Sequence, residues 1–431
     1  MAPAPSSGTS PLPQNAPSPA RPAQRLHPAG ADGDTLAHAL TTTTLIQIIA
    51  TATALALPPI APHAAHDFGI DAHYIGFQIS LIYLAGAGGS AVSGTLLHRF
   101  GANAMEIISL LLFAAGLLLL SLARLDIAIA ASLLIGLGYG LQNPASSLIL
   151  NRVCPPQKRS LVFSVKQAGV PIGAVLSALG LPLLDGSVGW RVTLAVASAG
   201  PVLLAAHLAW HHRHARHGYK PGASFLSGFV AEQKLVWSMG TLRVLSALGL
   251  LYSAVQLSLS AFVVLMLVEN HGWPLLSAAA ISGLLQGCGA VGRVTWGWLA
   301  DRRGSGIGIL SFIGVASTAG LVAFPFLDAF PMAVQIALLC AVGFCLSGWN
   351  GVAMAEIART APPQETGRVM GGALVYTFIG VMLGPASFAL IFEHLGRYDT
   401  TFTAISLAMA AGALASGAMA WSRHRARTRR T

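Results

Sequence analysis

The sequence predicts an all-α membrane protein with twelve transmembrane helices in two six-helix halves. Composition, long apolar segments and an internal repeat support this prediction. Of the 431 residues, 54% are hydrophobic and only 9% are charged, a balance that does not suit a soluble domain with a solvated surface. The chain is therefore expected to span the membrane many times.

Twelve apolar segments are long enough to cross a bilayer as helices, which takes about 20 residues. The first six cover approximately residues 38–60, 73–98, 103–123, 127–150, 160–184 and 190–210. The second six cover approximately residues 243–268, 275–300, 306–327, 332–357, 367–391 and 399–421. The sequence thus divides into an N-terminal half (38–210) and a C-terminal half (243–421).

Three polar stretches complete the predicted organisation. Residues 1–37 are rich in Pro, Ala and Ser and lack a basic region leading into an apolar core, so we expect a disordered cytoplasmic tail and no signal peptide. Residues 211–242 form a basic cytoplasmic linker, and residues 422–431, "SRHRARTRRT", form a basic cytoplasmic tail.

The positions of the basic residues explain the net charge of +10. With both termini inside, twenty of the 25 Lys and Arg fall on the cytoplasmic side and only three fall outside. This asymmetry follows the positive-inside rule and predicts a multi-pass protein of a bacterial inner membrane with both termini cytoplasmic. Membrane lipids are the expected partners of these charges, and no nucleic acid is implied.

A repeat relates the two halves. "GTLLHRFGA" at residues 94–102 resembles "GWLADRRGS" at residues 297–305, and "PPQ" occurs at residues 155–157 and again at 362–364. Asn143 and Asn350 have the same offset as the two "PPQ" stretches, 207 residues. These offsets indicate two halves in parallel register.

These motifs resemble those of the major facilitator superfamily, over about residues 38–421. The hinge between the second and third helices of each half reads G-x-L-A-D-R-x-G-R/K in that family, and "GWLADRRGS" fits it up to the last residue. "GTLLHRFGA" keeps the glycines and the arginine but has His98 in place of the acid. A second family pattern, G-x-x-x-G-P, appears as "GVMLGP". The resemblance implies alternating access and assigns gating roles to Gly94, Arg99, Gly297, Asp301, Arg302, Gly380, Gly384 and Pro385.

The second hinge has a physical rationale of its own. A carboxylate such as Asp301 at a helix end can accept hydrogen bonds from backbone N–H groups of a neighbouring helix. His98 leaves two interpretations open, because an interfacial histidine needs no role and a protonated one could replace part of a latch. The first hinge is therefore predicted to be the weaker one.

Two cations, Lys166 and Arg293, are the only charges predicted to lie well within helices, each roughly 9–11 Å from the cytoplasmic end. In the fold that the sequence resembles, their helices face each other, so both would face one cavity. An unpaired charge in hydrocarbon costs at least about 2.5–3.5 kcal/mol, which favours an anionic substrate as partner. Snorkelling of both side chains toward the headgroups is the alternative. The polar side chains expected to complete the site are Tyr83, Gln256, Tyr376 and Asn350.

We therefore predict a secondary active transporter of a small organic anion, with a carboxylate as the favoured class and protons or a counter-anion as coupling partner. "GRVTWGWLAD" resembles the eighth helix of monocarboxylate porters, although Gly289 stands where they carry an acid. A proton-coupled exporter of drugs or siderophore-like metabolites, or a transport-inactive receptor, remains an alternative. No nucleotide-binding loop, cofactor or enzymatic activity is expected. The histidines at 207, 211 and 214 are assigned to an interfacial helix end and to no metal site.

Overall fold

The computed structural model describes residues 35–70, 75–213 and 225–428, and these residues are helical almost throughout, with no strand among them. Ten of the described helical segments are long and apolar enough to cross a membrane, and α13 (Ile307–Val322) is a shorter apolar helix. A further helix, α12 (Leu275–Arg302), has 28 residues and is rich in glycine. The predicted all-α fold with twelve membrane-spanning segments is confirmed; residues 1–34 lie outside the described part.

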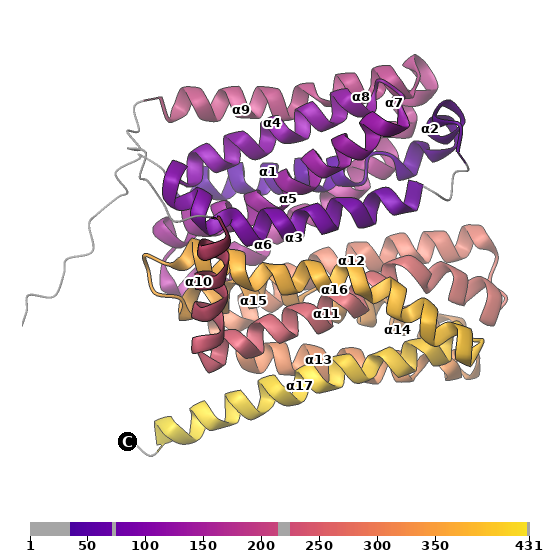
Figure 1. Ribbon diagram of the computed structural model, residues 1–431. Helices are drawn as coiled ribbons and strands as arrows, with labels where there is room; N and C mark the ends of the chain where they lie inside the picture. The colour runs from indigo at the N-terminus through magenta and orange to yellow at the C-terminus, as the bar shows by residue number, and fades with distance from the viewer. Residues whose placement is uncertain (1–34, 71–74, 214–224, 429–431) are drawn as a thin grey trace, which may run out of the picture.

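The N-terminal half occupies one layer of the molecule (Figure 1). Its helices are α1 (Leu36–Ala54), α2 (Ala61–Phe68), α3 (Ile75–Phe100), α4 (Ala102–Leu120), α5 (Leu125–Val153), α6 (Arg159–Val175), α7 (Leu181–Val188), α8 (Trp190–Ala197) and α9 (Ala199–His211). The fifth predicted segment is α6 and α7 joined by a π turn, and the sixth is α8 followed directly by α9.

The C-terminal half forms the second layer. Its helices are α11 (Gly240–Leu265), α12, α13, α14 (Met332–Leu346), α15 (Trp349–Thr360), α16 (Thr366–Leu395) and α17 (Tyr398–Thr428). The tenth predicted segment is therefore two helices, α14 and α15, separated at Ser347 and Gly348.

Glycines allow close contact between helices within each half. A Cβ atom on Gly140 of α5 would lie 2.2 Å from the Gly86 carbonyl oxygen of α3. Likewise, Cβ atoms on Gly380 and Gly384 of α16 would lie 2.1 and 2.3 Å from carbonyl oxygens of α11. The "GVMLGP" motif, which the sequence analysis assigned to gating, thus packs α16 against α11 inside the C-terminal half.

The two halves meet along α3 with α16 and along α6 with α12. Ser90 Oγ donates a hydrogen bond to the Gly371 carbonyl at 2.9 Å, across the first contact. In the second contact, a Cβ atom on Gly297 would lie 2.4 Å from Ser164 Oγ. Both contacts lie toward the end of the molecule where the loops after α3 and α12 are found, which we call the hinge end. The opposite end is called the far end.

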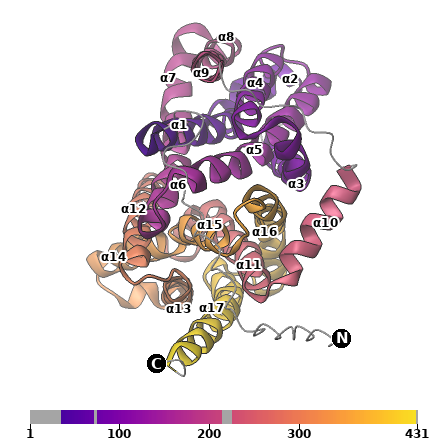
Figure 2. The same ribbon diagram turned by 90° about the vertical axis from the view of Figure 1, so that its left-hand side faces the viewer.

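The chain between the halves contains a helix that the sequence analysis did not predict. This helix, α10 (Phe225–Ser238), lies beside α3, α11 and α16 at the hinge end, which faces the viewer in Figure 2. The predicted linker (211–242) is therefore helical over much of its described part.

Gly297 offers a first testable prediction. Because its missing side chain lets α12 touch α6, Gly297→Ala should prevent full closure of the hinge end and reduce transport at least tenfold. Gly287→Ala on the same helix is the matched control, since a Cβ atom there would meet nothing within 4 Å. Distances between labels on the two halves measure closure, and equal effects of the two substitutions would contradict this role of Gly297.

Candidate functional site

A cavity of about 240 Å³ lies between the halves and is lined by helices of both. Helices α1, α3, α5 and α6 contribute from one half, and α11, α12, α15 and α16 from the other. Four of the predicted site residues line it: Arg293, Tyr83, Gln256 and Asn350. The fold thus brings together predicted site residues that are up to 267 positions apart in the chain.

Arg293 of α12 supplies the positive charge of this cavity. Its side chain is buried in protein, with 3% of the residue exposed, and its Nη1 donates a hydrogen bond to the Gln167 carbonyl at 2.6 Å. Its Nε has no hydrogen-bond partner. Among the described residues, no aspartate or glutamate lines the cavity. The guanidinium group can therefore bind an anion bidentately, as arginine does with carboxylates.

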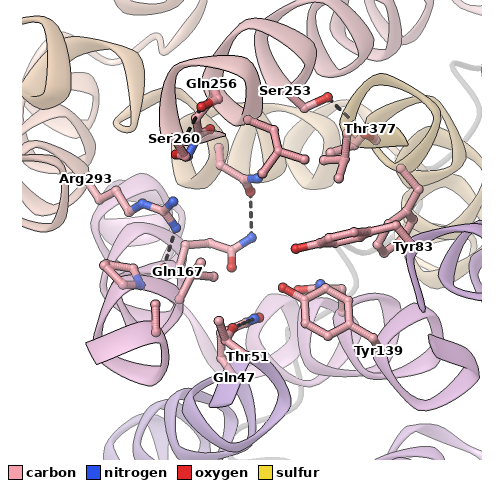
Figure 3. Close-up of a pocket in the computed structure, with 18 of the residues that line it drawn as sticks. Gln47, Thr51, Tyr83, Tyr139, Gln167, Ser253, Gln256, Ser260, Arg293 and Thr377 are labelled. Atoms are coloured by element: carbon pink, nitrogen blue, oxygen red, sulfur yellow. Dashed lines mark hydrogen bonds between the residues drawn. The ribbon is translucent and has the colours of Figure 1, made fainter. Parts of the chain in front are cut away.

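Aromatic rings face Arg293 from the other side of the cavity. The rings of Tyr83, Tyr139 and Phe378 contact one another, with centroids 5.8–6.3 Å apart. Figure 3 shows Tyr83 and Tyr139 pointing into the open space across from Arg293. We call these three residues the aromatic wall. A cation opposite an aromatic wall suits a small ligand that has an anionic and an apolar end.

Amides and hydroxyls complete the lining. Gln167 of α6 donates to Asn350 Oδ1 of α15 at 2.6 Å, so this hydrogen bond joins the two halves at the cavity (Figure 3). Trp349 Nε1 donates to Gln256 Oε1 at 2.8 Å. The Oε1 atom of Gln167 is buried without a partner and is available to a ligand that carries a hydroxyl group.

Gln167 and Tyr139 are two of the cavity residues that the sequence analysis missed. Tyr139 lies four positions before Asn143, which also lines the cavity, and residues at i and i+4 share a helix face. This spacing was the available signal. Gln167 stands directly after Lys166, and Lys166 was predicted to face the cavity instead because it is charged.

Lys166 requires a correction, because it does not line the cavity. Its Nζ donates a hydrogen bond to Asn143 Oδ1, and its charge interacts with that of Glu106 on α4. Glu106 is itself buried and accepts a hydrogen bond from Ser146 Oγ at 2.9 Å. This carboxylate lies close to the start of α4 and is nevertheless enclosed by the protein. Lys166 is stabilised by groups of its own half, and neither it nor Arg293 reaches the protein surface.

Tyr376 also lies elsewhere than expected. Its hydroxyl donates to Gln233 Oε1 of α10 at 2.8 Å and accepts from Trp237 Nε1 of the same helix at 2.5 Å. Tyr376 therefore connects α16 to the linker helix at the hinge end and is absent from the cavity lining. The neighbouring Thr377 and Phe378 line the cavity instead.

The second hinge joins the two halves through contacts of Asp301, which we call the latch. Asp301 accepts hydrogen bonds from the backbone N–H groups of Ser160 and Leu161, at 2.9 and 2.7 Å, in the first turn of α6. Arg359 Nη2 pairs with the same carboxylate at 3.0 Å and donates to Ser160 Oγ. The carboxylate thus satisfies helix N–H groups of the opposite half. Arg302 stacks over the Trp298 ring at 3.9 Å, outside this latch.

The histidine cluster has no metal-binding geometry among the described residues. His38 packs against the rings of His207 and His211, with centroids 6.0 and 4.2 Å away. No group of three potential ligands in the described part of the chain could hold a metal ion. His214 lies outside that part.

Comparison with known sequences identifies relatives over most of the chain. A family model described as Major Facilitator Superfamily matches residues 43–385. A gallate transporter of Pseudomonas putida is 26% identical over 367 residues, which cover 78% of this chain and 79% of that protein. A 4-hydroxybenzoate transporter of the same species is 25% identical over 384 residues, covering 80% of this chain and 84% of that protein.

Other comparisons cover less sequence or show the fold alone. The chain spans about half the length, 52%, of two transporters of Mycobacterium tuberculosis that it matches at 25–26% identity. Among solved structures, the E. coli fucose:proton symporter superposes with a TM-score of 0.70 at 17% sequence identity. That superposition covers 89% of this chain and 98% of the symporter.

Proposed function

We propose that this chain, which belongs to the major facilitator superfamily, is a secondary transporter that carries a small aromatic carboxylate by alternating access. The observation that carries the proposal is the position of Arg293 opposite the aromatic wall in a cavity shared by both halves. A carboxylate would pair with the guanidinium group, and the ring of the same molecule would contact Tyr83, Tyr139 and Phe378.

The size and charge of the cavity support this substrate class. Pockets for drug-sized ligands have volumes of roughly 300–1,000 Å³, so a cavity of about 240 Å³ suits a smaller molecule. With Arg293 and no carboxylate in the described lining, a cationic drug would meet uncompensated repulsion. The names of the two Pseudomonas relatives, which are transporters of gallate and 4-hydroxybenzoate, are consistent with an aromatic acid.

We further propose that the hinge end faces the cytoplasm of a bacterial inner membrane and that protons drive the transport. In the described part of the chain, most arginines and lysines lie at or near that end, as the positive-inside rule requires. The hydrogen bonds of Asp301 to α6, that of Ser90 to Gly371 and the packing of α10 on α3 hold the hinge end together, which supports a form closed on this side.

Competition in proteoliposomes tests the proposed substrate. Purified protein should take up labelled 4-hydroxybenzoate under an imposed proton gradient, and unlabelled benzoate should compete. Phenol, which lacks the carboxylate, and cyclohexanecarboxylate, which lacks the aromatic ring, should each compete at least tenfold less well. If phenol competed as well as benzoate, the proposed role of Arg293 would be contradicted. If cyclohexanecarboxylate competed as well as benzoate, the proposed role of the aromatic wall would be contradicted.

The proposed orientation makes a separate prediction. Reporter domains fused after Gly218 and after Trp421 should both be located in the cytoplasm, because the basic segments there resist translocation. If both reporters were located in the periplasm, the proposed orientation would be inverted. If one were in the cytoplasm and the other in the periplasm, the chain between the two fusion points would not cross the membrane an even number of times.

A further inference from the structure

The linker helix α10 connects both halves at the hinge end. Toward the C-terminal half, Gln233 Nε2 donates to the Gly372 carbonyl at 3.2 Å, beside the Tyr376 contacts described above. Toward the N-terminal half, α10 packs so tightly on α3 that a Cβ atom on Gly228 would lie 2.1 Å from Thr95 Oγ1. Figure 2 shows α10 running from beside the N-terminal half to α11 and α16 of the C-terminal half. Opening of the hinge end must therefore break contacts of α10 with one half.

Glu232 of α10 occupies the center of this contact. The residue is fully buried, with 0% exposed, and its carboxyl group is inserted between α3 and α16. A Cβ atom on Gly94 would lie 2.2 Å from Glu232 Oε1 and 2.7 Å from Arg368 Cγ. Gly94 begins the first hinge, the copy in which His98 replaces the acid. In space, therefore, α10 supplies a carboxyl group to the hinge that lacks one in sequence.

This carboxyl group is poorly compensated. Neither oxygen accepts a well-formed hydrogen bond, although the Thr95 backbone lies close. The nearest cation, Arg368, is paired with Glu365 at 2.8 Å and forms no ion pair with Glu232. At the hinge end of the surrounding helices, the other charged or titratable groups are His98 and Arg99 on α3, Arg243 on α11, Tyr376 on α16 and Lys234 on α10 itself. Burial raises the pKa of Glu232 to about 8, the charge of Arg368 opposes this rise, and that of Glu365 adds to it.

We propose that Glu232 is a proton-binding site that locks the hinge end: the neutral, protonated carboxyl group fits between α3 and α16, whereas the carboxylate favours their separation. When the halves separate, water reaches the group and its pKa returns toward the ordinary value of about 4.3. The closed form thus binds the proton more tightly, and by linkage proton binding stabilises the closed form. If the hinge end faces the cytoplasm, acidification of the cytoplasm holds the transporter shut on that side.

The sign and range of the effect follow from these two pKa values. Between about pH 4.3 and pH 8 the closed form is protonated and the open form is not, so the ratio of open to closed molecules rises with pH, at most tenfold per unit. Above about pH 8 both forms are ionised, and the ratio becomes independent of pH.

Distance measurements test the proposed role of Glu232 directly. They need no substrate, so a negative result would contradict this role without bearing on the proposed substrate. Spin labels at Gln157→Cys and Gln364→Cys, two exposed positions on opposite halves, report opening in liposomes after the native cysteines are replaced by alanine. The ratio of open to closed molecules should rise at least tenfold from pH 6 to pH 8 and then level off. Glu232→Gln should stay closed at every pH.

Two further variants keep the test decisive. His98→Asn removes the histidine of the first hinge, and it should retain the full pH dependence. Arg368→Gln removes the nearest positive charge, and it should move the levelling-off to higher pH, even if Glu232→Gln fails to fold. The proposal is overturned if the wild type shows no pH dependence, if the dependence survives Glu232→Gln, or if it disappears in His98→Asn.

Discussion

Replacement of Arg293 is expected to cause the largest loss of substrate binding of any single change in the cavity. Arg293→Gln removes the positive charge that lines the cavity and should weaken binding of an aromatic carboxylate by about 2–5 kcal/mol, because a desolvated ion pair is lost. This corresponds to roughly thirtyfold or more in Kd. Arg293→Lys keeps the charge but loses the planar fork, so we expect a smaller, still measurable loss, on the order of tenfold.

Equilibrium binding to purified protein provides the measurement, and two controls make it specific. Arg303→Lys lies at the end of the same helix, outside the cavity lining, and should bind normally. Phenol-type competitors without a carboxylate should bind wild type and Arg293→Gln alike. Unchanged affinity for 4-hydroxybenzoate in both Arg293 variants would leave the anion site without support.

The number and order of the spans could be predicted because each needs only local information. Apolar length fixes a transmembrane helix whatever its neighbours are. The helix α10 was missed for the opposite reason: its 14 residues include Glu232, Gln233 and Lys234, and such a short amphipathic helix is stabilised mainly by packing against its neighbours. The division of the tenth span at Ser347 and Gly348 also depends on contacts that no window of apolar residues reveals.

The kinds of residue in the site could be predicted from the sequence, but the direction in which each side chain points could not. An inventory of charges identified Arg293, because few cations lie within the apolar segments. The same inventory could not distinguish Lys166 from Gln167, since consecutive residues of a helix point about 100° apart. Only the tertiary packing shows that Gln167 faces the cavity and that Lys166 turns toward Asn143 and Glu106. The burial of a side chain was equally hard to predict: Glu106 is near a helix end in sequence, yet its neighbours bury it.

Asp301→Asn is expected to open the hinge end and to impair transport far more than His98→Asn does. The Asp301 carboxylate accepts two backbone hydrogen bonds from α6 and pairs with Arg359, and its side chain is 9% exposed. An asparagine keeps one acceptor, but its amide group would face an N–H donor, and the charge would be lost. Hydrogen bonds to charged groups contribute about 1.5–3 kcal/mol, so the closed form should lose roughly tenfold to a hundredfold in population relative to the open form.

His98 lies at the corresponding position of the first hinge, and its side chain is exposed. Surface substitutions of this kind change stability by roughly 0.5 kcal/mol or less, so His98→Asn should shift the populations about twofold at most. A cysteine at Ser164, which is buried against Gly297 and Gly351 in the closed form, reports opening through its reaction with a membrane-impermeant thiol reagent. Faster reaction in Asp301→Asn than in His98→Asn is the expected result. Equal rates and equal transport in the two variants would contradict the asymmetry between the hinges, because the carboxylate that joins α12 to α6 would then contribute no more to closure than an exposed imidazole.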